Sequence, residues 1–217
     1  MQYFAHPNNT PPIMEHAYQI RLAHAGDATQ IATIYAYYAQ ETAITFDYDS
    51  PSASEFAERI VQNSLMYPWL VVEQDGIILG YAYGSQHRTK TAYQWSPEST
   101  IYVDRNRHGK RMGRILYETL FSLLKMQGYV NVYAGVTVPN EKSEGLHTSL
   151  GFEVIGDFKN IGFKQGKWHD VRWLVLHLTA HGAHPSPPLP MEAIVGSEEF
   201  RHILAKANDA LNQNHRL

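Results

Sequence analysis

The segment from Val103 to Arg114 combines positive charge with two glycines, and it leads from a β-rich run into an apolar-striped helical segment. The unpaired N–H groups and the positive dipole end of such a helix can hold a pyrophosphate. Gly109 and Gly113 would let the backbone approach it closely. A solvated basic loop would have the same composition, and the residues alone leave both interpretations open.

Glu98 is a candidate general base for chemistry on an amine. An α-ammonium group has a pKa of about 8, so a reacting amine needs a base that removes its proton. Glu98 lies just before a β-rich run, residues 99–103, that leads to the basic segment. Taken alone, most carboxylates of this kind are ordinary surface groups.

A sheet and several helices must position these residues. Strands are expected at residues 18–22, 69–73, 77–83, 99–103, 130–138, 152–155 and 171–178. Helices are expected after a cap at Asp27, after a capping box of Ser52 with Glu55, over residues 115–126, after Asn140 and after Ser197. Asp75-Gly76 predicts a tight hairpin turn, and Gly128 a helix stop. The order of elements predicts an α/β fold, with helices on both faces of a mixed central sheet.

The chain divides into three parts by composition. Residues 1–17 are expected to form a flexible leader, residues 18–179 one compact domain, and residues 180–217 a linker rich in Pro and His followed by a helix. Residues 1–17 do not have the pattern of a signal peptide. The apolar runs are far shorter than the ~20 residues of a membrane-spanning helix, so a membrane protein is not expected.

Composition also excludes several kinds of site. The chain has 217 residues and no Cys, which rules out disulfides, thiolate metal sites and Cys nucleophiles and permits an intracellular location. No H-E-x-x-H motif occurs among the 12 His, so no metal site is expected. The formal charge of -3 and the lack of aromatics within the basic segment argue against a nucleic-acid partner.

Between His108 and Gly113 the chain resembles the acyl-CoA-binding loop of the GNAT acetyltransferases, whose motif is Q/R-x-x-G-x-G/A. His108 stands where Gln or Arg is usual, and Arg111 stands where the first motif glycine is usual. The backbone at Arg111 is therefore not expected to use angles reserved for glycine. Either the affinity for pyrophosphate falls, or Arg111 adds a charge to the phosphates; both alternatives remain open.

A more specific similarity to the phosphinothricin acetyltransferases, a group of GNAT enzymes, runs through residues 18–178. The matching segments are Tyr67 to Val71, Ala92-Tyr93, Trp95, Glu98 to Thr100, Tyr102-Val103, Pro139-Asn140, Leu150 to Phe152 and Gly162 to Val171. The resemblance implies the GNAT fold with a mostly antiparallel sheet, acetyl-CoA as cosubstrate and no metal. It also implies a cytoplasmic homodimer.

The resemblance assigns chemical roles to individual residues. Glu98 is the implied base, and the backbone N–H of Val103 is the implied stabiliser of the carbonyl oxygen. His147 stands where many GNAT enzymes have a Tyr and would donate a proton to the leaving CoA thiolate. Asn140 would bind the pantetheine arm as well as cap a helix. The full implied cofactor set is Tyr102, Val103, His108, Gly109, Lys110, Arg111, Met112, Gly113, Arg114 and Asn140.

Arg88 and Lys90, followed by Tyr93, are the expected contacts for an acidic substrate, because Arg and Lys pair with carboxylate or phosphinate groups. The related enzymes carry Lys and Arg in the opposite order, so the exact acidic group stays open. Phe46 and Tyr83 are expected to wall the pocket, although aromatic residues more often belong to the core. The expected reaction is transfer of an acetyl group to the amine of a small amino-acid-like substrate of phosphinothricin or methionine sulfoximine type.

Two rival functions remain. One is a GNAT enzyme that acetylates a peptide N-terminus, a polyamine or an antibiotic amine; the other is an acyl-CoA-binding module without catalysis. Arg88 and Lys90 would repel a cationic amine, which argues against the first. Glu98 together with His147 favours an enzyme over the second.

Overall fold

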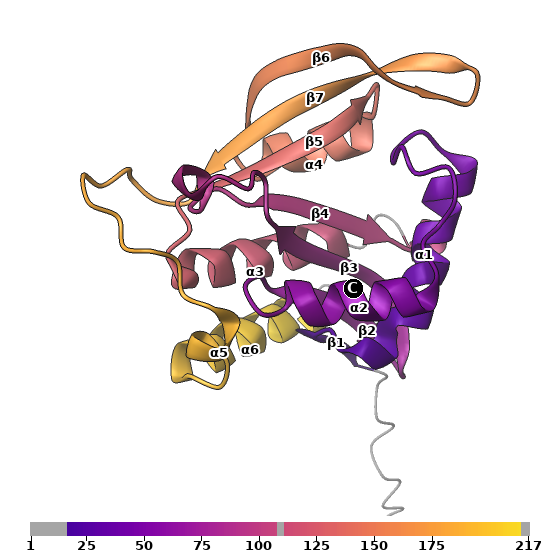
Figure 1. Cartoon of the computed structure of the whole chain (residues 1–217). Coiled ribbons are helices and arrows are strands. Elements are labelled where there is room, and N and C mark those ends of the chain that lie inside the picture. The colour runs from indigo at the N-terminus through magenta and orange to yellow at the C-terminus, as the bar shows by residue number, and fades with distance from the viewer. Residues whose placement is uncertain (1–16, 108–110, 214–217) are drawn as a thin grey trace, which may run out of the picture.

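The computed structural model describes residues 17–107 and 111–213, which are built around a seven-stranded sheet (Figure 1). The strands are β1 (Tyr18–Leu22), β2 (Trp69–Gln74), β3 (Ile77–Ser85), β4 (Glu98–Val103), β5 (Asn131–Val138), β6 (Glu153–Lys164) and β7 (Lys167–His177). Their spatial order is β1-β2-β3-β4-β5-β7-β6. Neighbouring strands are antiparallel except β4 and β5, which are parallel. The predicted mixed, mostly antiparallel sheet is confirmed.

Helices pack on both faces of the sheet, as predicted (Figure 1). They are α1 (Ala28–Glu41), α2 (Ala53–Asn63), α3 (Met112–Gln127), α4 (Glu141–Ser149), α5 (Met191–Ile194) and α6 (Glu198–Gln213). On one face, Ile31 of α1 and Ile60 of α2 are buried in a core with Trp69. On the other, α3, α5 and α6 share a second core with the sheet. None of the helices in the described ranges is long and apolar enough to cross a membrane.

Several local signals in the sequence act as predicted. The Ser52 side chain accepts a hydrogen bond from the Glu55 backbone N–H, and the Glu55 carboxylate accepts one from the Ser52 N–H, which starts α2. Asp75 and Gly76 turn the hairpin of β2 and β3 with φ angles of 55° and 76°. Gly128 ends α3 with a φ of 95°. These signals are local, so nearby residues suffice to predict them.

Asp27 behaves differently from the prediction. It occupies the cap position before α1, but its side chain makes no capping hydrogen bond to that helix. Its carboxylate instead accepts two hydrogen bonds from Arg21, at 2.7 and 2.9 Å, and one from the backbone N–H of His24. Because a hydrogen-bonded ion pair with Arg is stronger than a neutral capping bond, the carboxylate faces β1.

The hairpin of β6 and β7 is longer than the sequence predicts. Residues 152–155 and 171–178 were expected as short strands, whereas β6 and β7 run from Glu153 to His177 with a turn at Gln165 and Gly166. Register shifts after Val154 and Phe158 interrupt the two-residue alternation by which a strand is recognised. The hairpin exposes the large apolar side chains of Val154, Ile155, Phe158, Ile161, Phe163 and Trp168.

Helix α6 covers the open edge of β1. Asn208 Oδ1 accepts a hydrogen bond from the Ile20 N–H at 2.6 Å, and Asn212 Oδ1 accepts one from the Tyr18 N–H at 2.9 Å. Both amides also donate back, to the carbonyl oxygens of Ile20 and Tyr18. Since an open edge strand is a template for unwanted pairing, the two asparagines take the place of a neighbouring strand.

Candidate active site

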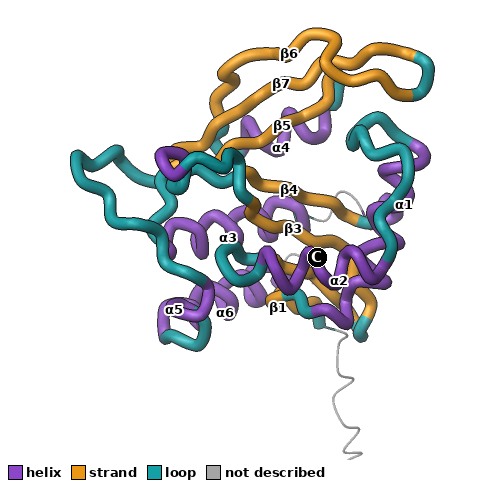
Figure 2. The backbone as a smooth tube through the Cα atoms, viewed as in Figure 1, coloured by secondary structure: helices purple, strands orange, loops and turns teal. Residues whose placement is uncertain are grey.

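The parallel strands β4 and β5 run apart beyond their first residues (Figure 2). A cleft lies where they separate. The register between them contains one pair, Glu98 with Tyr133, at the beginning of β4. Beyond this pair lies a cavity of about 100 Å³. Its walls come from β4, β5, α3, α4 and the segment after α1: Ile44, Ser99, Thr100, Ile101, Tyr102, Tyr117, Ala134, Gly135, Val136, Thr137, Asn140, Ser143 and His147.

Glu98 belongs to the single pair of β4 and β5, at the closed end of the cleft, and it precedes Ser99, which lines the cavity, although Glu98 itself does not line it. Its side chain is 32% exposed, and its Oε1 atom is 2.5 Å from Nδ1 of His87. On the other side of β4, Glu98 pairs with Ser85 of β3. The predicted base is thus held on a strand of the central sheet rather than on a loop.

His147 lines the cleft and is deeply buried, with 2% exposure. Its Nδ1 lies 2.7 Å from the carbonyl oxygen of Ser143, and since a carbonyl only accepts, Nδ1 carries the hydrogen. Its Nε2 is buried and has no hydrogen-bond partner among the described residues. Burial lowers the pKa of His147, and the bond to Ser143 offsets this in part. The imidazole is therefore neutral near pH 7, and Nε2 presents a lone pair.

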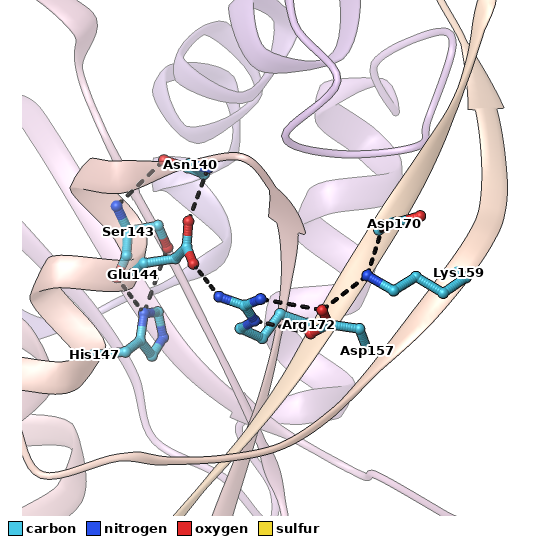
Figure 3. Close-up of polar contacts among 8 residues, drawn as sticks. All are labelled: Asn140, Ser143, Glu144, His147, Asp157, Lys159, Asp170 and Arg172. Atoms are coloured by element: carbon cyan, nitrogen blue, oxygen red, sulfur yellow. Dashed lines mark hydrogen bonds and ion pairs between the residues drawn. The ribbon is translucent and has the colours of Figure 1, made fainter.

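The first turn of α4 is tied to the β6–β7 hairpin by a chain of polar contacts (Figure 3). Asn140 caps the helix by accepting from the Ser143 N–H, and its own N–H donates to Glu144. The other oxygen of Glu144 accepts from Arg172 of β7 at 2.6 Å. Arg172 also donates twice to Asp157 of β6, and together with Lys159 it holds the pKa of that carboxyl well below its usual range.

This network fixes the wall of the cleft. Asn140, Ser143 and His147 all come from the cleft side of α4, and the same helix turn reaches the hairpin through Glu144. Lys159 extends the chain to Asp170 at 3.0 Å. Helix α4, which carries His147, is therefore tied to both strands of the hairpin.

The predicted cofactor loop is described in part. His108, Gly109 and Lys110 lie outside the described residues. Arg111 is exposed, and its backbone is left-handed, with a φ of 56°, immediately before α3. The expectation that Arg111 avoids the region favoured by glycine is therefore wrong. Met112 is buried in the core at 2% exposure, so only its backbone is available to a ligand. A Cβ added to Gly113 would lie 3.5 Å from Ile101, an ordinary contact, so the protein itself does not require glycine there.

The remaining predicted cofactor residues occupy different environments. Arg114 pairs with Glu118 at 2.8 Å and donates to Ser149 Oγ, so its guanidinium is engaged within the protein. Tyr102 lines the cleft. The hydroxyl of Tyr38 donates to the carbonyl oxygen of Val103, which fixes the end of β4 next to the loop.

Three predicted substrate residues line a different cavity. Arg88, Lys90 and Tyr93 contribute to a space of about 320 Å³ that also includes His87, whereas none of the three lines the β4–β5 cleft. His87 connects the two regions, since it lines the larger cavity and contacts Glu98. The base therefore contacts a side chain that lines the same cavity as Arg88 and Lys90.

The two aromatic residues predicted to wall the pocket also lie outside the lining of the β4–β5 cleft. Tyr83 stacks on Trp69 with ring centroids 4.0 Å apart. Phe46 packs against Gly162 of β6, where an added Cβ would come within 2.2 Å of its ring, and it lies beside His169. Phe46 follows Ile44, which lines the cleft, so this segment lies between the cleft and the hairpin.

Two residues at the site are missing from the prediction. His87 has no short spacing to Glu98 that would pair them, because they are 11 positions apart on different elements. Lys164 is 3% exposed, and its Nζ donates to the carbonyl oxygens of Ala39, Thr45 and Asp47 at 2.6 to 2.7 Å. It therefore fastens the segment that carries Phe46 to the hairpin. A single lysine in sequence gives no signal for such a contact.

Within residues 17–107 and 111–213, no group of three or more His, Asp or Glu is arranged to hold a metal. The site instead offers a carboxylate, a neutral imidazole and a helix N-terminus around a cleft. These groups suit proton transfer and anion binding.

Comparison with known proteins identifies the family. The sequence model of a protein family, the acetyltransferase (GNAT) domain, matches residues 20–173. A phosphinothricin N-acetyltransferase of Streptomyces viridochromogenes is 31% identical over 81% of this chain and 94% of its own length. An L-methionine sulfoximine/L-methionine sulfone acetyltransferase of Salmonella typhimurium is 32% identical over 76% of this chain and 96% of its own.

A solved structure agrees in fold. The GNAT superfamily phosphinothricin acetyltransferase of Sinorhizobium meliloti, in complex with AcCoA, superposes with a TM-score of 0.73 at 30% identity. The match covers 79% of this chain and 96% of that one. The chain therefore belongs to the GNAT family of acetyltransferases.

Proposed function

We propose that this acetyltransferase moves an acetyl group from acetyl-CoA to the amino group of a small amino-acid-like substrate, of the phosphinothricin or methionine sulfoximine type. The observation that carries the proposal is the position of Glu98 at the closed end of the β4–β5 cleft. A carboxylate fixed there can take the proton that a reacting amine must lose. The similarity to phosphinothricin and methionine sulfoximine acetyltransferases supports the class of substrate.

The residues of the cleft fit acetyl-CoA. The N-terminus of α3, with Arg111 before it, suits the pyrophosphate. Asn140 and His147 line the cleft through which the pantetheine arm would pass. The Nε2 atom of His147 lacks a partner among the described residues, and a ligand in the cleft would supply one. When bound, acetyl-CoA supplies the thioester whose C–S bond is broken.

The proposed step transfers one acetyl group and two protons. The ammonium group of the substrate gives one proton to Glu98, and the resulting neutral amine attacks the carbonyl carbon, so that the C–N bond forms while the C–S bond breaks. CoA leaves as a thiolate, the second proton of the new amide nitrogen passes to that thiolate, and Glu98 returns its proton to solvent. The backbone N–H of Val103 stabilises the negative charge that grows on the carbonyl oxygen. His147 lies on the proposed path of the leaving sulfur. In its neutral form, with Nδ1–H bound to Ser143, His147 accepts a hydrogen bond at Nε2. It can donate one from Nε2 only after that atom gains a proton.

Release of free CoA from acetyl-CoA tests the proposal. The panel contains phosphinothricin, methionine sulfoximine, ordinary amino acids, polyamines, aminoglycosides and a peptide. The expected result is turnover on the acidic amino-acid analogues, falling about 10²–10⁴-fold in Glu98→Gln. Glu58→Gln, at an exposed site on α2, is the matched control and keeps full activity. Turnover restricted to cationic amines would overturn the substrate class, and no turnover with any amine would overturn the activity.

We also propose that the protein is a homodimer. The apolar side chains exposed on the β6–β7 hairpin, among them Phe158 and Trp168, support an interface there, because exposed apolar clusters favour association. Analytical ultracentrifugation of wild type and Trp168→Lys tests this, with dissociation expected in the variant. A wild type that sediments as a monomer at all concentrations would contradict it.

Use of acetyl-CoA supports a cytoplasmic location, which fractionation of the source cells would test.

A further inference from the structure

His87 contacts the proposed base, although neither the sequence motifs nor the proposed step assigns it a role. Its Nδ1 atom is 2.5 Å from Oε1 of Glu98. The side chain of His87 is 12% exposed and that of Glu98 is 32% exposed. The contact is thus partly shielded from water, where a hydrogen bond to a charged group is stronger than on an open surface.

Aromatic rings from two strands hold the imidazole in place. The ring of His87 stacks on Tyr133 of β5, with centroids 4.9 Å apart and planes 7° apart. Trp173 of β7 meets it edge-on at 5.5 Å. His87 itself follows β3, and Glu98 begins β4. Four neighbouring strands of the sheet therefore converge on this pair, where the cleft closes.

The chemistry of the two groups defines the direction of the hydrogen bond. An ionised carboxylate only accepts hydrogen bonds, so Nδ1 of His87 must carry the hydrogen when Glu98 is ready to act as a base. Donation to Oε1 leaves Oε2 of Glu98 to take the proton of the amine. The same bond restricts a flexible side chain to one orientation, which favours proton transfer along a fixed path.

We propose that His87 is a positioning residue that orients the carboxylate of Glu98 for proton abstraction. This inference rests on the function proposed above, in which Glu98 is the base. It adds a residue that acts through Glu98. The stacking on Tyr133 makes a purely structural role the rival explanation, and the experiment separates the two.

Two substitutions distinguish a donor from a packing group. His87→Phe keeps an aromatic ring on Tyr133 but removes the donor, whereas His87→Asn keeps an N–H near the position of Nδ1 but loses the ring. Steady-state rates of CoA release are measured for both variants, the wild type and Glu98→Gln. In His87→Phe we expect kcat to fall about 10-fold to 100-fold, part of the about 10²–10⁴-fold effect of a general base, while KM for acetyl-CoA stays unchanged. His87→Asn is expected to keep most of the kcat that His87→Phe loses.

Each outcome decides a separate point. If His87→Phe is as active as wild type, or more active than His87→Asn, the residue serves packing and the inference is overturned while the proposed function stands. If Glu98→Gln keeps full activity, Glu98 is not the base, and the inference falls although the enzyme is an acetyltransferase. A wild type without turnover on any amine overturns the proposed function and the inference with it.

Discussion

Nδ1 of His147 donates a hydrogen bond to the backbone carbonyl oxygen of Ser143, one helical turn earlier in α4, at 2.7 Å. This bond fixes the tautomer, because the hydrogen must lie on Nδ1 and the lone pair on Nε2. Burial at 2% exposure disfavours the charged ring and lowers its pKa. His147 can therefore donate a proton from Nε2 only if that atom first takes up a proton during the reaction.

The lowered pKa of His147 makes folding stability depend on pH. Below the ordinary His pKa of about 6.5, the unfolded chain binds a proton that the folded chain binds only at lower pH, so stability falls as the pH drops through that window. We expect His147→Gln to lose less stability than wild type between about pH 7.5 and about pH 5.5. Urea unfolding at both pH values measures the difference. His202→Gln, at an exposed site on α6, should match wild type, and equal pH dependence in all three proteins would contradict the argument.

The pairing of Asn208 with Ile20 at the edge of β1 predicts a specific loss of stability. Asn208→Ala leaves the Ile20 N–H without its partner, which costs about 1–3 kcal/mol. Asp209→Ala, on the exposed side of the same helix, should change the free energy of unfolding by less than about 0.5 kcal/mol. Chemical denaturation compares the two variants. A small effect of Asn208→Ala would mean that water replaces the amide at this edge.

The sequence predicts those features that neighbouring residues determine. The capping box of Ser52 with Glu55 and the turn at Asp75-Gly76 depend on residues within three positions of each other, and both form as expected. The asparagines of α6 bond to β1 across 188 and 194 positions, and Lys164 bonds to carbonyls more than 100 positions away. No local pattern encodes such contacts.

The candidate site shows the same division. Glu98 and His147 are predicted through resemblance to a family motif; His147 lines the cleft, and Glu98 lies in the strand pair at its closed end. His87 escapes prediction because its contact with Glu98 depends on how β3, β4, β5 and β7 come together. The wall of the larger cavity likewise combines Tyr67 with Pro188, which only the folded chain brings close.

Gly162 is required by the ring of Phe46. A Cβ at position 162 would lie 2.2 Å from Cε2 of Phe46, so Gly162→Ala must displace that ring or the hairpin. Such overpacking typically costs about 1–3 kcal/mol. We expect a lower melting temperature and a higher KM for the amine, because the segment between the cleft and the hairpin shifts.

Adding Phe46→Ala to Gly162→Ala should remove the steric conflict. Gly182→Ala, where an added Cβ meets nothing within 4 Å, is the control; a variant Gly162→Ala that behaves like it would contradict this account.

Arg111 combines a left-handed backbone with a charge at the start of α3. A residue other than glycine in this conformation costs about 1–2 kcal/mol, whereas glycine adds about 0.4–1 kcal/mol of flexibility to the unfolded chain. Arg111→Gly should therefore be at least as stable as wild type in urea unfolding. If the guanidinium attracts the CoA phosphates, Arg111→Gly and Arg111→Asn should both bind CoA several-fold more weakly, with less dependence on salt, since an exposed ion pair contributes about 0.2–1 kcal/mol and is screened by salt. Arg111→Lys keeps the charge and should bind nearly as tightly as wild type. Isothermal titration calorimetry at two salt concentrations measures these affinities. Unchanged affinity in Arg111→Gly would mean that Arg111 forms the turn without contributing its charge to the phosphates.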